Sequence, residues 1–103
     1  ELHRANLSLV DAVQRDPLTG LANRRALGPL LEVAGRRGAT LLFFDLDGFK
    51  AINDRHGHDV GDACLRRFAE ALRARFPDAD GLLRYAGDEF VVVAVDIAPD
   101  DLG

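Results

Sequence analysis

Apolar and polar positions follow two periods along the chain, and the two periods predict different elements. Steps of three and four residues between apolar positions are typical of a helix with one buried face, and they occur at residues 1–14, 27–34 and 60–76. Short β-rich apolar runs predict strands at residues 39–46, 82–85 and 90–95. With a further short helical segment at 49–56, this order predicts an α/β (α+β) sandwich in which helices flank a mixed sheet.

Turn and cap residues set the boundaries between these elements. Asp16-Pro17 ends the first helix, because the residue before a proline is displaced from the helical conformation. Residues 18–22 are then expected to form a connector, and Asn23 can cap the next helix. Gly28-Pro29 falls inside that helix and is expected to delay or bend its start. Near the other end of the chain, Ala86-Gly87-Asp88-Glu89 separates two strands as in a tight hairpin.

The longer apolar segments indicate where the core lies. Residues 39–46 form a nearly continuous apolar run, which predicts a strand buried on both faces. One face of the helix at 60–76 is apolar, and we interpret Cys64 on that face as a small core residue rather than a nucleophile or a ligand. The face consists of Val60, Cys64, Leu65, Phe68, Leu72 and Phe76.

Composition and charge narrow the class of protein. The chain of 103 residues is long enough for one domain, and its net charge of −4 argues against a nucleic-acid-binding surface. No apolar run has the length of a membrane span, the N-terminus does not resemble a signal peptide, and a single cysteine suits a reducing cytoplasm. An acidic domain can still bind a polyphosphate if its carboxylates hold a divalent cation.

Three carboxylates are candidates for such a cation site. Asp45 lies at the end of an apolar strand, and Asp88 and Glu89 lie at the tip of the predicted hairpin. If the hairpin lies beside the Asp45 strand, the three converge and would repel one another without Mg²⁺ or Mn²⁺. Such a site supports phosphoryl or nucleotidyl transfer. The simpler interpretation is that Asp88 and Glu89 are solvated turn residues, and that a nearby aspartate, Asp47, caps the next helix.

The segment between these carboxylates has groups suited to a nucleotide. Gly48-Phe49-Lys50 follows the strand end, so backbone N–H groups and one lysine could face phosphates at a helix start. Asn53 can donate and accept a hydrogen bond, whereas Asp62 can only accept, and this pair matches the donor edge and N3 of guanine. Taken alone, Asn53 and Asp62 are more often surface or capping residues.

Four motifs in order resemble one family over residues 16–95. They are Asp16-Pro-Leu-Thr-Gly-Leu-Ala-Asn-Arg-Arg25, Phe44-Asp-Leu-Asp-Gly-Phe-Lys-Ala-Ile-Asn-Asp54, Gly57-His-Asp-Val-Gly-Asp62 and Arg84-Tyr-Ala-Gly-Asp-Glu-Phe90. The chain thereby resembles the GGDEF domain of bacterial diguanylate cyclases. The resemblance implies a nucleotidyl-cyclase (palm-like) sheet, and a homodimer in which two GTP molecules are condensed to cyclic di-GMP and pyrophosphate. It also implies an upstream sensory or signalling domain and no contact of this segment with nucleic acid or membrane.

The resemblance assigns a role to each candidate residue. Asp45, Asp88 and the backbone carbonyl of Leu46 would hold two Mg²⁺ (or Mn²⁺) ions. Asp88 or Glu89 would assist deprotonation of the attacking hydroxyl, while Asn53 and Asp62 would recognise guanine. Gly48, Phe49 and Lys50 would lie near the phosphates. Residues 1–15 would form a linker or signalling helix, and residues 16–103 a partial GGDEF domain.

The chain departs from the family pattern at three places. Ala86 replaces the first glycine of the signature, which harms the site only if that backbone needs a positive φ or a close approach to GTP. An inhibitory product site of the family uses Arg-x-x-Asp, where this chain has Pro77-Asp78-Ala79-Asp80. The sequence also stops before the family's later strands and the helix that grips the terminal phosphates, so the 103 residues alone are expected to be inactive.

Two other functions fit the sequence. A degenerate GGDEF domain would bind GTP as a regulatory module without turnover, and Ala86 keeps this alternative open. A purely structural unit would dimerise through the apolar positions of residues 2–12. GTP binding that depends on a metal separates the first two functions from the third, and product formation separates the first from the second.

Overall fold

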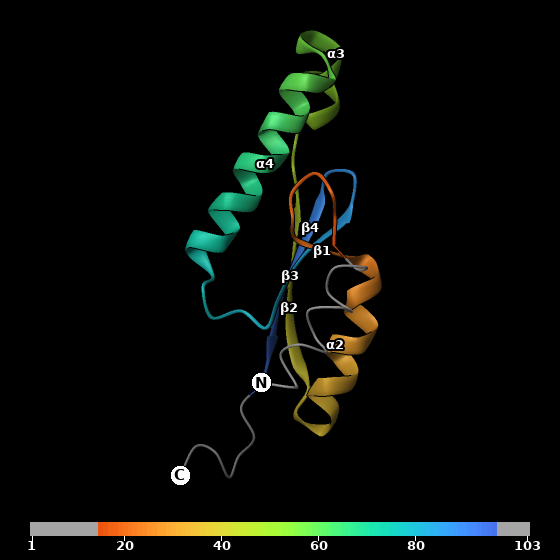
Figure 1. Cartoon of the computed structure of the whole chain (residues 1–103), viewed down its shortest axis with the longest axis vertical. Helices are drawn as coiled ribbons and strands as arrows, with labels where there is room; N and C mark the ends of the chain where they lie inside the picture. The colour runs from red at the N-terminus through yellow and green to blue at the C-terminus, as the bar shows by residue number, and fades with distance from the viewer. Residues whose placement is uncertain (1–14, 97–103) are drawn as a thin grey trace.

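A computed structural model of the chain describes residues 15–96, in which a four-stranded mixed sheet lies between helices (Figure 1). The order of the strands across the sheet is β1-β3-β4-β2, with β1 parallel to β3 and the other neighbours antiparallel. The helix predicted for residues 1–14 lies outside the described residues. The strands are β1 (Ala22–Asn23), β2 (Ala39–Asp45), β3 (Gly81–Ala86) and β4 (Glu89–Val95), and the helices are α2 (Leu27–Ala34), α3 (Phe49–His56) and α4 (His58–Arg75).

The two faces of the sheet carry separate apolar clusters. Successive side chains of β4 point to opposite faces, so Phe90 and Val92 pack in one cluster with the α4 residues Leu65 and Leu72. Val91 and Val93 belong to the other cluster, beside Leu83 of β3 and residues of α2. In Figure 1, α4 and α2 accordingly lie on opposite sides of the strands. The predicted α/β layering with mixed strand pairing is confirmed. Within the described residues, no helix is long and apolar enough to cross a bilayer.

The β3–β4 hairpin forms as the sequence predicts. Gly87 and Asp88 are the two residues of its turn, and Ala86 pairs with Glu89 across it. The register shifts between Arg84 and Ala86, which marks a bulge in β3. No residue other than glycine has a positive φ in residues 15–96, so the backbone at Ala86 does not require the glycine found in the family signature.

One expectation about the elements is wrong. The strand at 39–46 is not buried on both faces: β2 ends at Asp45, and Leu42 and Phe43 are 43% and 62% exposed. The reason is that β2 has a single neighbour, β4, within the described residues and therefore lies at an edge of this sheet. The expectation that Gly28-Pro29 delays or bends the start of the next helix agrees with the structure, because Asn23 caps a 3₁₀ turn at Arg24–Ala26 and α2 itself begins only at Leu27.

The apolar face of α4 is only partly buried. Leu65 and Leu72 lie in the core, and Phe68 and Phe76 pack against it. Val60 is 42% exposed near the start of the helix, where α4 extends past the sheet, and Cys64 is half-buried rather than fully enclosed. The helix also buries the small residues Gly61 and Ala69, which an analysis of large apolar side chains does not select.

Candidate functional site

The acidic residues lie where the end of β2 meets the β3–β4 turn. Asp45 is the last residue of β2 and is the register partner of Glu89, the first residue of β4. One residue further, the Leu46 N–H donates a hydrogen bond to the Asp88 carbonyl oxygen at 3.1 Å. Two backbone connections therefore place Asp45 beside the hairpin turn. The hairpin thus lies beside the Asp45 strand, which is the condition under which the sequence analysis expected the carboxylates to approach one another.

The charges at this meeting point repel each other. The pKa of the Asp45 carboxyl is raised above its usual value, first because the Asp88 carboxylate lies close to it, and then through partial loss of solvation, a hydrogen bond with Asp88 and the charge of Asp47. A divalent cation between two carboxylates removes this repulsion. The donors present are carboxylate oxygens and backbone carbonyls such as that of Leu46, which fit Mg²⁺ or Mn²⁺.

The three predicted carboxylates do not by themselves form a metal-binding group of side chains in the described residues. Among residues 15–96, no group of three or more His, Cys, Asp or Glu side chains is arranged to hold a metal ion. Asp45 and Asp88 interact, whereas Glu89 pairs with Asp45 through the backbone ladder. A cation here would take its remaining ligands from backbone carbonyls, water or a phosphate, which is how Mg²⁺ is commonly bound beside one or two carboxylates.

Helix α3 begins four residues after Asp45. Gly48 precedes the helix with φ of 74°, a left-handed conformation that glycine adopts without strain, and no side chain caps the helix. The Phe49 N–H donates to the Leu46 carbonyl at 3.3 Å, and the exposed Lys50 follows. Helix α3 thus begins three residues after Leu46, and its uncapped start and Lys50 follow the carboxylate Asp45 closely in the chain.

Asn53 and Asp62 lie on the packed helices α3 and α4. The two helices are joined by Gly57 alone and contact each other. The side-chain oxygen Oδ1 of Asn53 is buried without a hydrogen-bond partner, beside the buried Gly61. Asp62, the next residue of α4, is half-buried. The structure therefore places Asn53 at the contact between α3 and α4, and Asp62 follows Gly61 of that contact in sequence.

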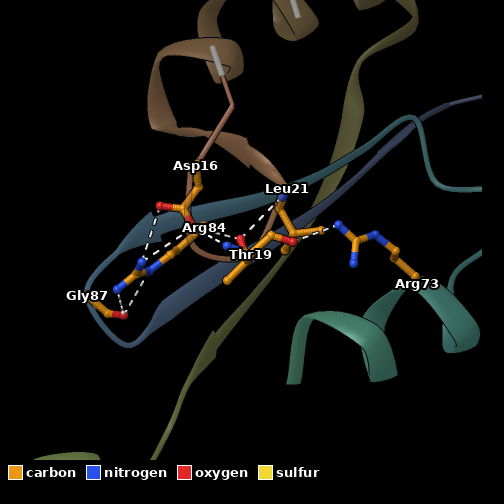
Figure 2. Close-up of polar contacts among 6 residues, drawn as sticks. All are labelled: Asp16, Thr19, Leu21, Arg73, Arg84 and Gly87. Carbon is orange, nitrogen blue, oxygen red and sulfur yellow. Dashed lines mark hydrogen bonds and ion pairs between the residues drawn. The ribbon is translucent and has the colours of Figure 1, made fainter. Parts of the chain in front are cut away.

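A polar network that the sequence analysis did not predict supports the hairpin turn (Figure 2). Arg84 of β3 donates to the Gly87 carbonyl through Nε at 3.1 Å and through Nη2 at 2.9 Å. Its Nη1 also lies 3.2 Å from Oδ1 of Asp16, with which it forms an ion pair. Arg84 therefore links the loop that follows Asp16 to the turn that contains Asp88.

The same loop is connected to α4. Both the backbone N–H and the hydroxyl of the buried Thr19 donate to Oδ2 of Asp16 at 2.8 Å. From α4, Nη2 of Arg73 donates to the Thr19 carbonyl at 2.8 Å (Figure 2). Burial alone would raise the pKa of Asp16, but the Thr19 hydrogen bonds and the Arg84 charge together hold it below its usual value. No local sequence signal marks the contacts of Arg84 and Arg73 with this loop, since these residues lie 68 and 54 residues from their partners Asp16 and Thr19.

Comparisons with known proteins agree with this arrangement. The family described as "Diguanylate cyclase, GGDEF domain" matches residues 13–102. The chain is 42% identical to the bifunctional diguanylate cyclase/cyclic di-GMP phosphodiesterase MucR of Pseudomonas aeruginosa, with 97% of the chain and 16% of MucR covered. It is 45% identical to the response regulator PleD of Caulobacter vibrioides, with 84% of the chain and 20% of PleD covered. The chain thus spans a fifth or less of the length of these two relatives.

Solved structures have the same fold. The diguanylate cyclase SiaD from Pseudomonas aeruginosa, in complex with its activator SiaC, superposes with a TM-score of 0.80 at 37% identity, over 99% of this chain and 42% of that one. The coiled coil and GGDEF domain of DgcB from Caulobacter crescentus, in complex with c-di-GMP, gives 0.73 at 29% identity, over 98% and 56%. The chain belongs to the GGDEF family of diguanylate cyclase domains.

Proposed function

We propose that this chain is the metal- and base-binding part of a diguanylate cyclase, which condenses two GTP molecules to cyclic di-GMP and pyrophosphate. The observation that carries the proposal is the Asp45–Asp88 pair, in which two repelling carboxylates are held together by the backbone next to an uncapped helix start. Such an arrangement costs stability unless a cation is bound, so its presence argues for metal-dependent chemistry.

Each side chain has a role in this proposal. Asp45, Asp88 and the Leu46 carbonyl hold Mg²⁺ or Mn²⁺, which supplies an activated hydroxyl and neutralises the departing pyrophosphate. Asp88 or Glu89 accepts the proton of the attacking 3′-hydroxyl. The backbone at Gly48 and Phe49, together with Lys50, binds phosphate oxygens. Asn53 and Asp62 distinguish guanine from adenine, because adenine would leave the Asp62 carboxylate unpaired.

The reaction needs two copies of the domain. Each 3′-hydroxyl attacks the α-phosphate of the GTP bound by the other copy, so we propose a homodimer with its two sites facing each other. The names of the similar proteins include a response regulator and a cyclase with a bound activator, which supports control by further domains or partners. GTP as the substrate also supports a cytoplasmic location for the reaction.

The test is product formation by the full-length protein that contains this chain. Incubation with GTP and Mg²⁺ is expected to yield cyclic di-GMP, separated by chromatography, and the yield should be lost in Asp88→Asn and when the metal is chelated. Asp78→Asn is the matched control, since Asp78 is an exposed carboxylate in the segment between α4 and β3. Residues 1–103 assayed alone are expected to be inactive. Turnover that persists in Asp88→Asn would refute the assignment of the site.

A second function is favoured by one comparison. The cyclic di-GMP phosphodiesterase NbdA of Pseudomonas aeruginosa is 44% identical over 100 residues, so the same domain occurs in a protein named for a different activity. In that case the chain would bind GTP with a metal and regulate a neighbouring domain without turnover. GTP binding by the full-length protein with no cyclic di-GMP formed would favour this second function.

A further inference from the structure

Among the glycines of the described residues, Gly61 is the one at which an added Cβ would come closest to a polar side chain. It lies in the first turns of α4, where it is buried. A Cβ built on Gly61 would lie 1.8 Å from Oδ1 of Asn53, 2.9 Å from its Cγ and 3.4 Å from Cζ of Phe49. The first two distances leave no space for any side chain at this position. The carboxamide of Asn53 therefore occupies the volume that a side chain at Gly61 would fill.

This contact favours one orientation of the Asn53 carboxamide. Because a carbon–carbon bond is about 1.5 Å long, the Cα of Gly61 lies within about 3.3 Å of Oδ1, the range of a Cα–H···O contact. The hydrogen of Gly61 that replaces a side chain points at this oxygen. A C–H group faces an acceptor favourably and an N–H donor unfavourably, so the contact selects the oxygen of the amide over its nitrogen.

The buried oxygen leaves the other end of the amide for a ligand. Oδ1 is the one side-chain nitrogen or oxygen atom in residues 15–96 that is buried with no hydrogen-bond partner. Nδ2 of Asn53 is not buried in this way, and it can donate two hydrogen bonds. Asp62 follows Gly61 directly and can only accept. One contact thus directs a donor on α3, and the residue that follows Gly61 on α4 is an acceptor.

We propose that Gly61 is a positioning residue for base recognition: it holds the Asn53 carboxamide with Oδ1 against its own Cα, so that Nδ2 donates to the N3 acceptor of the bound guanine. The inference rests on the proposed function, because it assumes that Asn53 contacts the base. If Gly61 served only to let α3 and α4 pack closely, the direction of the Asn53 amide would not affect which base is bound.

The experiment measures binding to the full-length protein by calorimetry. GDP and 3-deaza-GDP are the probes, because they differ in the N3 acceptor and, having no γ-phosphate, are not consumed by the proposed reaction. IDP, which lacks the N2 amino group, reports on Asp62 separately. The variants are Gly61→Ala, Asn53→Ala and the double variant. Gly28→Ala is the matched control, because Gly28 is also helical and an added Cβ there would meet no atom within 4 Å.

We expect the wild-type protein to bind GDP at least about tenfold more tightly than 3-deaza-GDP, the effect of one hydrogen bond in a shielded site. Gly61→Ala should reduce this ratio towards one, as Asn53→Ala does, while the ratio of GDP to IDP is retained. Gly61→Ala should lower the thermal midpoint in the wild-type background but not in the Asn53→Ala background, where the contact is gone. Gly28→Ala should change neither ratio.

Two results would overturn the inference, and they differ from a failure of the proposed function. An unchanged preference for GDP over 3-deaza-GDP in Gly61→Ala would show that Gly61 does not orient the amide. Equal binding of the two probes by the wild-type protein would show that Nδ2 does not contact N3. Equal binding of GDP and ADP would instead refute base recognition as a whole, whereas the coupling of thermal midpoints between positions 53 and 61 would still report on the packing.

Discussion

The contact between Asp16 and Arg84 is expected to stabilise the turn that contains Asp88. The perturbations are Arg84→Ala, Asp16→Ala and the double variant. Arg84→Ala removes two hydrogen bonds to the Gly87 carbonyl and one ion pair. Asp16→Ala removes the same ion pair and leaves the buried Thr19 N–H without its acceptor. Both changes act on the turn without touching the carboxylates of the site.

The size of the effect follows from the geometry and the exposure of the two side chains. Arg84 and Asp16 are 19% and 14% exposed, so their interaction is only partly screened by water. The two hydrogen bonds to the Gly87 carbonyl are exposed and share one acceptor, so each contributes less than the roughly 1.5–3 kcal/mol of a shielded bond to a charged group, and we expect Arg84→Ala to cost about 1–2 kcal/mol in total. The Asp16–Arg84 pair itself should contribute about 1 kcal/mol, the upper end for a partly exposed ion pair.

The assay is hydrogen exchange at single amides in the full-length protein. The Leu46 N–H donates to the Asp88 carbonyl, so its exchange reports on the turn, while the Gly57 N–H, bonded to the Asn53 carbonyl at 2.8 Å, is an internal control. Arg84→Ala should accelerate exchange at Leu46 by about 5- to 30-fold, since 1.4 kcal/mol corresponds to a factor of ten. Arg24→Ala, which removes an exposed arginine near the same loop, should have no effect.

Two outcomes would refute this reasoning. Unchanged exchange at Leu46 in Arg84→Ala would show that the guanidinium does not support the turn. Strictly additive effects in the double variant would show that Asp16 and Arg84 are not coupled. A pH series is a further check. Because the pKa of Asp16 is lowered in the folded protein, its contribution is fully present above the unfolded pKa of about 3.9 and is lost as the pH falls through the folded pKa.

Three further predictions concern the acidic site and its surroundings. Asp45→Asn should raise the thermal midpoint of the chelator-treated protein at pH 7 and weaken Mn²⁺ binding, measured by electron paramagnetic resonance. Since the pKa of Asp45 is raised by Asp88, the gain in thermal midpoint should vanish below about pH 3.9, and a lower midpoint of the variant at pH 7 would contradict the prediction. Ala86→Gly should leave turnover unchanged and reduce the free energy of unfolding by about 0.5–1 kcal/mol, because this strand position needs no positive φ. A large rise in turnover would show that the methyl group of Ala86 obstructs GTP. Product formation should stay linear in time as cyclic di-GMP accumulates, because Pro77 stands where the family's inhibitory site has arginine and offers no hydrogen-bond donor. Product inhibition that is lost in Arg75→Ala would show that Arg75, which lines a groove with Pro77, replaces that arginine.

The sequence by itself determined the elements whose signals are local. The three- and four-residue steps of apolar positions predicted α4, because a helix of 3.6 residues per turn brings those positions to one face. Gly87-Asp88 between two β-rich runs predicted the hairpin, since the choice of turn residues depends on neighbours in the chain. The resemblance of four motifs also indicated the family and the acidic residues at the end of β2.

Only the tertiary structure decided how these elements support one another. The position of β2 at an edge depends on the order of the strands, which its apolar composition does not encode. The Asp16–Arg84 pair and the contact between Asn53 and Gly61 arise from segments that meet after folding. Charge and hydrogen-bonding capacity can be assigned to a residue from its type alone, but its partner depends on which helices and strands become neighbours. For that reason the sequence indicated which groups carry the chemistry, and the fold determined what holds them in place.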